Sequence, residues 1–335
     1  MFKKEKVKIS IYPTTCTMNK NEVRKIYRSG KGSYILTLPK EWVVTNSMKE
    51  GDIVYLEVQK DVILISPKSR QIKNKSAEID SRGANFNQLV RLIISHYLAG
   101  YDLIRVKTYT DEQRRGVAFA VDMLVGAEIM EDTGNKIVVE VFLDSRRFNV
   151  ADVIEKLFKI CTSMLSDFCN CLKNFNRAIC SSIVVRENEV DKIHFLALRL
   201  LNKAMEGEEM GLNAKEVVNY RSIIRTLERI ADHVSSAAEA LVNLQTSFPR
   251  ICNTVNEVEE TFKVAMIAFF KKDVEIAEQV LEEYEILEKE IQKNYEEILK
   301  SDVVEALNLK TILDGLWRVA AYSADIAEIV LDVSV

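Results

Sequence analysis

The stretch Arg221–Leu241, RSIIRTLERIADHVSSAAEAL, decides how the second half of this chain folds. Apolar residues recur around it at steps of three and four, which is the spacing of one face of an α-helix. This apolar stripe consists of Tyr220, Ile224, Leu227, Ala231, Val234, Ala238 and Leu241. The stretch therefore predicts a long helix with one face buried against partner helices.

The same apolar stripe recurs at a constant offset near the end of the chain. Its second copy consists of Leu309, Leu313, Leu316, Ala320, Ser323, Ala327 and Val330. One pattern repeated in this way predicts an internal repeat of helical units.

A polar stripe lies beside the first apolar stripe. Glu228 and Asp232 are four residues apart, so both carboxylates point the same way from successive turns. Acidic groups at the border of a helical core are expected to have a positively charged partner. This partner is either a metal ion or the side chains of the nearby Arg225 and Arg229. The second repeat has Trp317 and Ala321 at the matching positions, so a metal site is expected only once.

The segment Leu227–His233, LERIADH, resembles the signature of the PhoU family of phosphate-uptake regulators. The resemblance implies two tandem three-helix repeats and a metal-cluster site at Glu228 and Asp232. Asp191 and Glu187, on the preceding helix, are the additional oxygen donors that we expect. Carboxylate ligands suit iron, manganese, magnesium or calcium, so the expected cofactor is a divalent or iron cation.

The chain reads as helical from Asn149 to its end, which makes the expected fold mainly α. Short connections favour antiparallel neighbours, in two PhoU-like three-helix bundles that cover 149–247 and 248–335. The expected helices are 150–175, 181–206, 213–245, 252–271, 274–299 and 303–333.

The net charge is −4, but basic and acidic residues are distributed unevenly along the chain. Residues 1–75 contain 16 Lys and Arg against 7 Asp and Glu, whereas the remainder contains 30 against 43. A basic N-terminal part on an acidic body indicates nucleic-acid contact at one end. A solvated basic face without a partner is the alternative.

The basic part begins with residues 1–21, which show no sustained period and are expected to be a flexible arm. A translated leader before Met18 is the alternative. Over 22–68 we expect a strand, a glycine turn at Gly30–Gly32, a second strand and a short helix after Pro39. A β-hairpin should complete this module.

The segment Lys31–Trp42, KGSYILTLPKEW, followed by Lys49–Asp52, KEGD, resembles the AbrB/SpoVT family of DNA-binding modules. The resemblance implies a homodimer of swapped hairpins, and about 45 residues of short strands bury too little surface alone. The side chains expected to face phosphates and groove edges are Arg24, Lys25, Arg28, Lys31 and Lys40. An antitoxin-like or protein-binding use of the same fold is the alternative.

Two further segments connect the N-terminal module to the helical repeats. Residues 69–83 are polar and are expected to form a linker. Residues 84–148 are expected to form a small α/β segment without a catalytic set, in which His96 is structural. His194 and His233 are likewise expected to be structural residues, at the borders of their helices.

The six cysteines form no Cys-x-x-Cys pair, so we expect reduced, buried thiols in a cytoplasmic protein. No apolar run approaches the roughly 20 residues of a membrane span, so no membrane insertion is expected. No nucleophile–base pair is evident, and the chain is expected not to be an enzyme. A metal-dependent bundle enzyme is the weakest alternative.

Two hypotheses of function remain. The first is a phosphate-responsive transcriptional regulator, in which an AbrB-like dimer binds DNA and the PhoU-like repeats sense phosphate status or dock a partner. The second is an adaptor that does not bind DNA. It would dock on a phosphate transporter or a signalling protein such as a kinase.

Overall fold

The structure is a computed structural model that describes residues 23–30, 32–59, 62–67, 75–206, 210–298 and 301–334. The chain forms two compact units, Met1–Ile72 and Lys73–Val335. Both the predicted arm over 1–21 and the candidate DNA-binding residue Lys31 lie outside the described residues.

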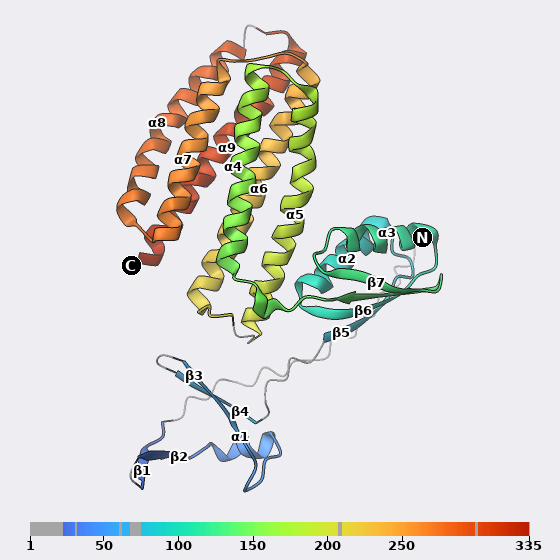
Figure 1. Cartoon of the computed structure of the whole chain (residues 1–335), viewed down its shortest axis with the longest axis vertical. Helices are drawn as coiled ribbons and strands as arrows, with labels where there is room; N and C mark the ends of the chain where they lie inside the picture. The colour runs from blue at the N-terminus through green and yellow to red at the C-terminus, as the bar shows by residue number, and fades with distance from the viewer. Residues whose placement is uncertain are drawn as a thin grey trace, which may run out of the picture. The chain divides into compact units, whose positions relative to one another are not determined.

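The first unit contains two separate antiparallel hairpins and one short helix (Figure 1). Gly30 makes the first turn with φ +62°, a value that favours glycine. Pro39 precedes the helix with φ −59°, which suits a helix start. The elements are β1 (Ile26–Ser29), β2 (Ser33–Leu36), α1 (Lys40–Thr45), β3 (Tyr55–Gln59) and β4 (Val62–Ser66).

No described side chain of this first unit is buried. Large apolar side chains lie open instead, with Tyr34 68% and Ile53 74% exposed. Other exposed members are Val23, Ile26, Tyr27, Ile35, Leu36, Val44, Tyr55, Leu56, Val58 and Ile63. One copy of the unit therefore leaves most of its own apolar surface uncovered.

The second unit begins with a four-stranded sheet in the order β5-β6-β8-β7. The pair β5 and β6 is parallel, while β8 is antiparallel to both β6 and β7. Apolar side chains of the sheet and of two helices share one core, as shown by Leu89, Ile104, Val117 and Val139, all fully buried. The elements are β5 (Lys75–Asp80), α2 (Phe86–Leu98), β6 (Tyr101–Lys107), α3 (Asp111–Asp122), β7 (Ala127–Asp132) and β8 (Lys136–Val141).

The prediction of a linker over 69–83 is wrong for residues 75–80, which form β5. This strand lies at the edge of the sheet, and only one of its faces contributes to the core. Ala77 and Ile79 are the apolar residues on that face. Two apolar residues in a charged stretch are too weak an alternation to predict a strand.

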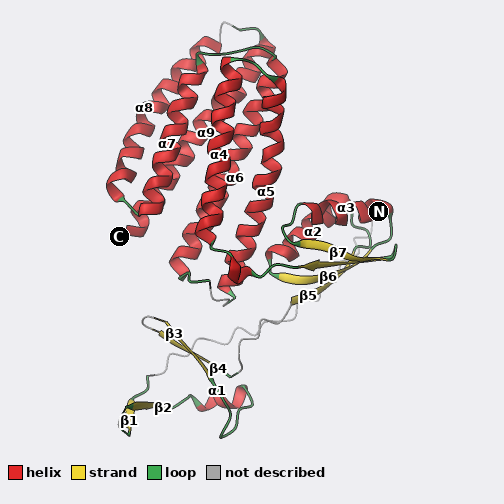
Figure 2. Cartoon of the chain, in the orientation of Figure 1, coloured by secondary structure: helices red, strands yellow, loops and turns green. Residues whose placement is uncertain are grey.

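Six long helices follow a 3₁₀ turn at Ser145–Arg147 and form one bundle (Figures 1 and 2). Asn149, Asn176 and Asn213 cap the first three helices by accepting hydrogen bonds from backbone N–H groups. The predicted six-helix architecture is confirmed. The helices are α4 (Val150–Lys173), α5 (Arg177–Met205), α6 (Ala214–Leu244), α7 (Ile251–Lys271), α8 (Val274–Ile298) and α9 (Val303–Ser334).

The two repeats, α4–α6 and α7–α9, share one continuous core. The apolar stripes of α6 and α9 meet at its centre, and both stripes are buried except for the partly exposed Tyr220. A Cβ added to Gly315 on α9 would lie 3.1 Å from the backbone oxygen of His233 on α6. Glycine therefore permits this close approach of the two helices.

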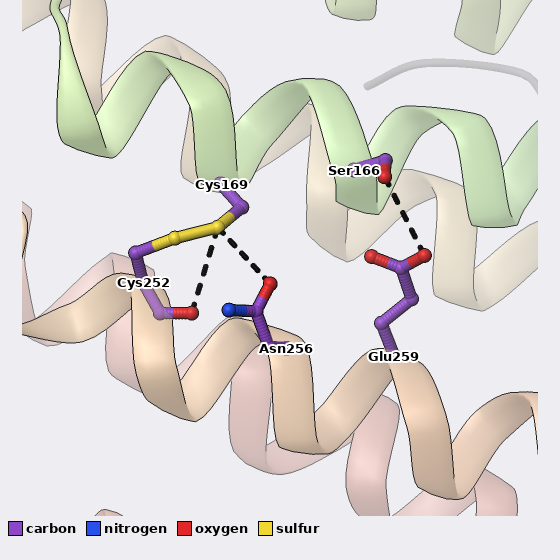
Figure 3. The surroundings of a disulfide bond; sticks show 5 residues. All are labelled: Ser166, Cys169, Cys252, Asn256 and Glu259. Carbon is purple, nitrogen blue, oxygen red and sulfur yellow. Dashed lines mark hydrogen bonds between the residues drawn. A yellow bond between two sulfur atoms is a disulfide. The ribbon is translucent and has the colours of Figure 1, made fainter.

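The expectation that the cysteines are all reduced is wrong for one pair. Cys169 near the end of α4 and Cys252 at the start of α7 form a disulfide (Figure 3). Cys161, Cys171 and Cys180 are buried free thiols. Because the bonded cysteines are separated by 83 residues, sequence spacing gives no signal for their pairing.

Candidate functional site

The four predicted acidic side chains come from two adjacent helices of the first repeat. Glu187 and Asp191 lie one turn apart on α5, and Glu228 and Asp232 lie one turn apart on α6. The side chains of all four are close enough to affect one another electrostatically. Ser235 on α6 donates a hydrogen bond of 2.6 Å to Oε2 of Glu187. The structure therefore gathers these residues into one acidic cluster.

Burial and mutual repulsion both act on this acidic cluster. Burial raises the pKa of Asp191 from 3.8 to about 6, with further contributions from the charges of Asp232 and Glu187. Burial likewise raises the pKa of Glu228 from 4.5 to about 7, with help from Asp232 and Asp191. The pKa of Asp232 is also raised, first by burial and then by Glu187. Burial and mutual repulsion thus both favour the protonated, neutral form of these carboxyl groups.

The arginine alternative is not what the structure shows. Arg225 and Arg229 lower the pKa of Glu228 through their charges. Within the described part of the chain, however, neither arginine forms an ion pair with Glu228 or Asp232. Both arginine side chains are exposed, and water screens their effect.

The negative charge of the ionised acidic cluster would attract a cation, but its four side chains are not arranged as metal ligands. Among the described residues, no group of three or more His, Cys, Asp or Glu side chains is arranged to hold a metal ion. Glu187, Asp191, Glu228 and Asp232 therefore remain predicted ligands, which would have to draw closer together around an ion.

The three histidines occupy structural surroundings. Burial lowers the pKa of His194 to about 4, so it is neutral, and its ring packs against Phe195. His233 on α6 lies 5.8 Å from the ring of Tyr322 on α9. His96 contacts Tyr101, with ring centroids 5.1 Å apart.

The second repeat lacks the acidic pair at the matching place. Trp317 donates a hydrogen bond of 3.2 Å from its indole N–H to Oε1 of Glu288, and the guanidinium of Arg318 lies 4.7 Å from the Trp317 ring. Ala321 carries no polar group. The acidic pattern on the long central helices is therefore confined to α6.

The candidate DNA-binding residues lie on exposed parts of the first unit. Arg24 and Lys25 precede β1, Arg28 lies on β1 opposite Tyr34, and Lys40 is the first residue of α1. All four side chains are exposed. The strand that carries Arg28, β1, also exposes its apolar side chains Ile26 and Tyr27.

Sequence reasoning missed a polar junction between the α/β layer and α5. Arg199 is fully buried, donates to the backbone oxygens of Tyr97 (2.6 Å) and Tyr101 (2.8 Å), and pairs with Asp102 at 2.5 Å. Lys203, one turn later, reaches the same carboxylate at 3.0 Å. The only sequence signal is an arginine inside an apolar run, Leu196–Leu201.

Comparison with known families supports both halves of this description. Residues 154–241 match the model of the PhoU domain. Residues 27–73 match the model described as antidote-toxin recognition MazE, bacterial antitoxin. No curated protein matches the chain. Among the described residues, no helix is long and apolar enough to cross a membrane.

Two solved structures are similar at low sequence identity. PhoU from Pseudomonas aeruginosa is 16% identical, with a TM-score of 0.47 over 55% of this chain and 95% of that one. The phosphate transport system regulatory protein PhoU from Streptococcus pneumoniae is 15% identical, with a TM-score of 0.47 over 55% of this chain and 93% of that one. The two family matches show that the chain carries a PhoU domain, which follows an N-terminal AbrB-like module in the sequence.

Proposed function

We propose that this protein is a phosphate-responsive transcriptional regulator. In this proposal two copies of the N-terminal module form a dimer that binds DNA, and the PhoU-like body senses phosphate status or docks a partner. The supporting observation is the combination of exposed basic side chains with an uncovered apolar surface in the first unit. A role on DNA places the protein in the cytoplasm.

The apolar surface of the first unit supports the dimer. Two-stranded hairpins are only marginally stable in water, and here no described side chain of either hairpin is buried. A second copy is the simplest partner that can cover Ile26, Tyr34 and Leu56, because each copy exposes the same surface. Swapped hairpins would supply that cover.

The charge of the first unit supports DNA as the ligand. A dimer would present Arg24, Lys25, Arg28 and Lys40 twice, and a protein that contacts 6–10 phosphates loses about 10³–10⁵ in affinity between 50 and 200 mM salt. Arg24→Ala with Lys25→Ala removes four positive charges per dimer. That change should lower the slope of log affinity against log salt by about 3 to 4.

The test uses the full chain and fluorescence anisotropy on a labelled DNA duplex at several salt concentrations. We expect steep salt dependence in the wild type and much weaker binding in Arg24→Ala/Lys25→Ala. The matched control is Lys289→Ala/Lys293→Ala on α8, where both side chains are exposed, and it should bind DNA like the wild type. A dimeric protein without salt-sensitive affinity for DNA would support the adaptor hypothesis instead.

Phosphate responsiveness requires its own experiment. Chromosomal fragments bound by the protein are recovered from cells grown at high and at low phosphate. We expect the occupied sites to differ between the two conditions. Identical occupancy would leave DNA binding intact and refute the sensing role.

A further inference from the structure

A small cavity lies at the end of the bundle where α4 and α6 begin and α7 and α9 end (Figure 1). Its volume is about 140 Å³. Ala151 on α4 and Tyr220 on α6 line it from the first repeat, and Phe269 on α7 and Val330 on α9 line it from the second. None of its described lining residues belongs to the acidic cluster. The cavity is therefore a separate site between the two repeats.

The walls of the cavity are mainly aromatic and aliphatic. The ring centroids of Tyr220 and Phe269 are 5.8 Å apart with an interplanar angle of 65°, and those of Phe269 and Phe270 are 5.5 Å apart at 61°. Aromatic pairs prefer such edge-to-face arrangements. Phe270 is 40% exposed whereas Val330 is buried, so an aromatic mouth leads to an aliphatic floor. A planar ring that enters the cavity extends this aromatic cluster.

Two polar side chains of the lining have unused hydrogen-bonding groups. Asn219 and Tyr220 make no side-chain hydrogen bond within the described part of the chain. The Asn219 amide and the Tyr220 hydroxyl can each donate and accept. Burial raises the pKa of Tyr220 above its ordinary value of 10.0, with a further contribution from Glu216, so the hydroxyl keeps its proton at neutral pH. A ligand with both donors and acceptors satisfies these two groups.

The charged side chains at the cavity neutralise each other. Nζ of Lys272 lies 3.5 Å from Oε1 of Glu216, and the Lys272 side chain is 62% exposed, which places the pair at the mouth. Oε2 of Glu216 accepts a hydrogen bond of 3.1 Å from the backbone N–H of Asn213, in the capping box that begins α6. Since both carboxylate oxygens are engaged and the two charges are opposite, the cavity favours an uncharged ligand over an ion.

The volume of the cavity limits the size of its ligand, because an apolar cavity of about 150 Å³ holds one benzene molecule. We propose that the cavity binds an uncharged planar ring compound, of the size of a phenol or a nucleobase, that carries hydrogen-bond donors and acceptors. Its ring packs against Tyr220, Phe269 and Phe270, and Asn219 binds its polar edge. The bound ring links the start of α6 to the ends of α7 and α9. This ligand site goes beyond the proposed function, because it requires neither DNA nor phosphate.

The test titrates the full chain with phenol, adenine and cyclohexanol, and measures binding by saturation-transfer-difference NMR and isothermal titration calorimetry. We expect saturable binding of phenol or adenine at one site per chain, and the tighter of the two identifies the class of ring. Cyclohexanol has the hydroxyl group of phenol without its planar ring, so it should bind about 2- to 10-fold more weakly than phenol. The proposal is refuted if neither planar ring binds saturably, or if phenol and cyclohexanol bind with equal affinity.

Variants place the ligand in the cavity. Ala151→Phe fills the cavity from the second residue of α4 and should abolish binding. Ala178→Phe is the matched control, because Ala178 is the exposed second residue of α5. The backbone N–H of each alanine donates to Oδ1 of its cap asparagine, at 2.9 Å for Asn149 and 3.0 Å for Asn176. The control should bind the ring like the wild type.

A milder variant and the wild type keep the test independent of the folding of Ala151→Phe. Tyr220→Phe retains the ring but loses the hydroxyl group, and should weaken binding about 2- to 10-fold. In the wild type, the ligand should slow amide hydrogen exchange over 214–220 and 267–272. Circular dichroism verifies that each variant is folded. Unchanged binding in folded Ala151→Phe, or protection confined to other segments of the wild type, would overturn the proposal.

Discussion

Replacement of Arg199 by methionine should severely weaken the attachment of the α/β layer to the helical bundle. Methionine fills much of the same space but donates no hydrogen bond. The change leaves the backbone oxygens of Tyr97 and Tyr101 without their buried donor and leaves Asp102 with Lys203 as its remaining cation.

The magnitude follows from the burial of the ion pair. The Arg199 side chain is fully buried and that of Asp102 is 13% exposed, so water cannot replace the lost partner. Removing one member of a buried ion pair destabilises a protein by about 3–5 kcal/mol. For a unit of this size, that loss corresponds to a melting temperature lower by about 10 °C. Arg199→Lys should recover only part of it, because an ammonium group cannot reproduce the planar fork.

The assay is thermal unfolding of the full chain by circular dichroism, together with amide hydrogen exchange over 97–102. Arg186→Met is the matched control, because Arg186 pairs with Asp167 and Ser163 but its side chain is 24% exposed. This more exposed pair should contribute about 1 kcal/mol or less. If Arg199→Met is no more destabilising than Arg186→Met, the buried junction does not hold the α/β layer in place.

Three further predictions concern the bundle. Opening the disulfide by Cys252→Ser should lower the free energy of unfolding by about 4.5 kcal/mol, because the bond closes a long loop in the unfolded chain; unchanged denaturant midpoints would contradict this value. The pKa of Asp191 (about 6) and that of Glu228 (about 7) lie above their ordinary values in the folded chain, which therefore binds extra protons between about pH 4 and 7. The contribution of these two carboxyl groups to stability should accordingly fall as the pH rises through 6 to 7. Glu228→Gln should therefore gain stability relative to the wild type from pH 5 to pH 8. A difference in melting temperature that stays constant with pH would exclude this. Manganese ions should raise the melting temperature of the wild type at neutral pH but not that of Glu228→Gln/Asp232→Asn, and equal shifts in both proteins would refute the metal prediction.

The six helices were predictable because their signals are local. Apolar stripes at helical spacing, asparagine caps and short breaks all lie within a few residues of the helix that they define. The repeat predicted that the stripes of α6 and α9 are both buried, but their packing against each other in one continuous core was seen only in the structure. By contrast, β5 has only one covered face, so its sequence did not differ from that of a charged linker.

The features that sequence reasoning missed depend on contacts between distant residues. Arg199 binds two backbone oxygens about 100 residues earlier, and no side-chain pattern marks a backbone oxygen as a partner. The Cys169–Cys252 pairing likewise depends on how α4 and α7 meet. The acidic cluster is an intermediate case. The helical spacing placed Glu228 beside Asp232, and the adjacency of α5 and α6 brought Asp191 and Glu187 to them.

One helix, α5, carries half of the acidic cluster as well as the polar junction, so both polar sites of the second unit depend on the position of this helix. Asp191 and Arg199 are eight residues apart, or about 12 Å along the helix axis. Further along, Glu206 at the end of α5 pairs with Lys75, the first residue of β5. Because Lys75 begins β5, this ion pair joins the start of the strand to the end of α5, on the same helix as the junction that Arg199 forms. Arg199→Met should therefore loosen the α/β layer on α5 while it leaves the carboxyl groups of the acidic cluster in place.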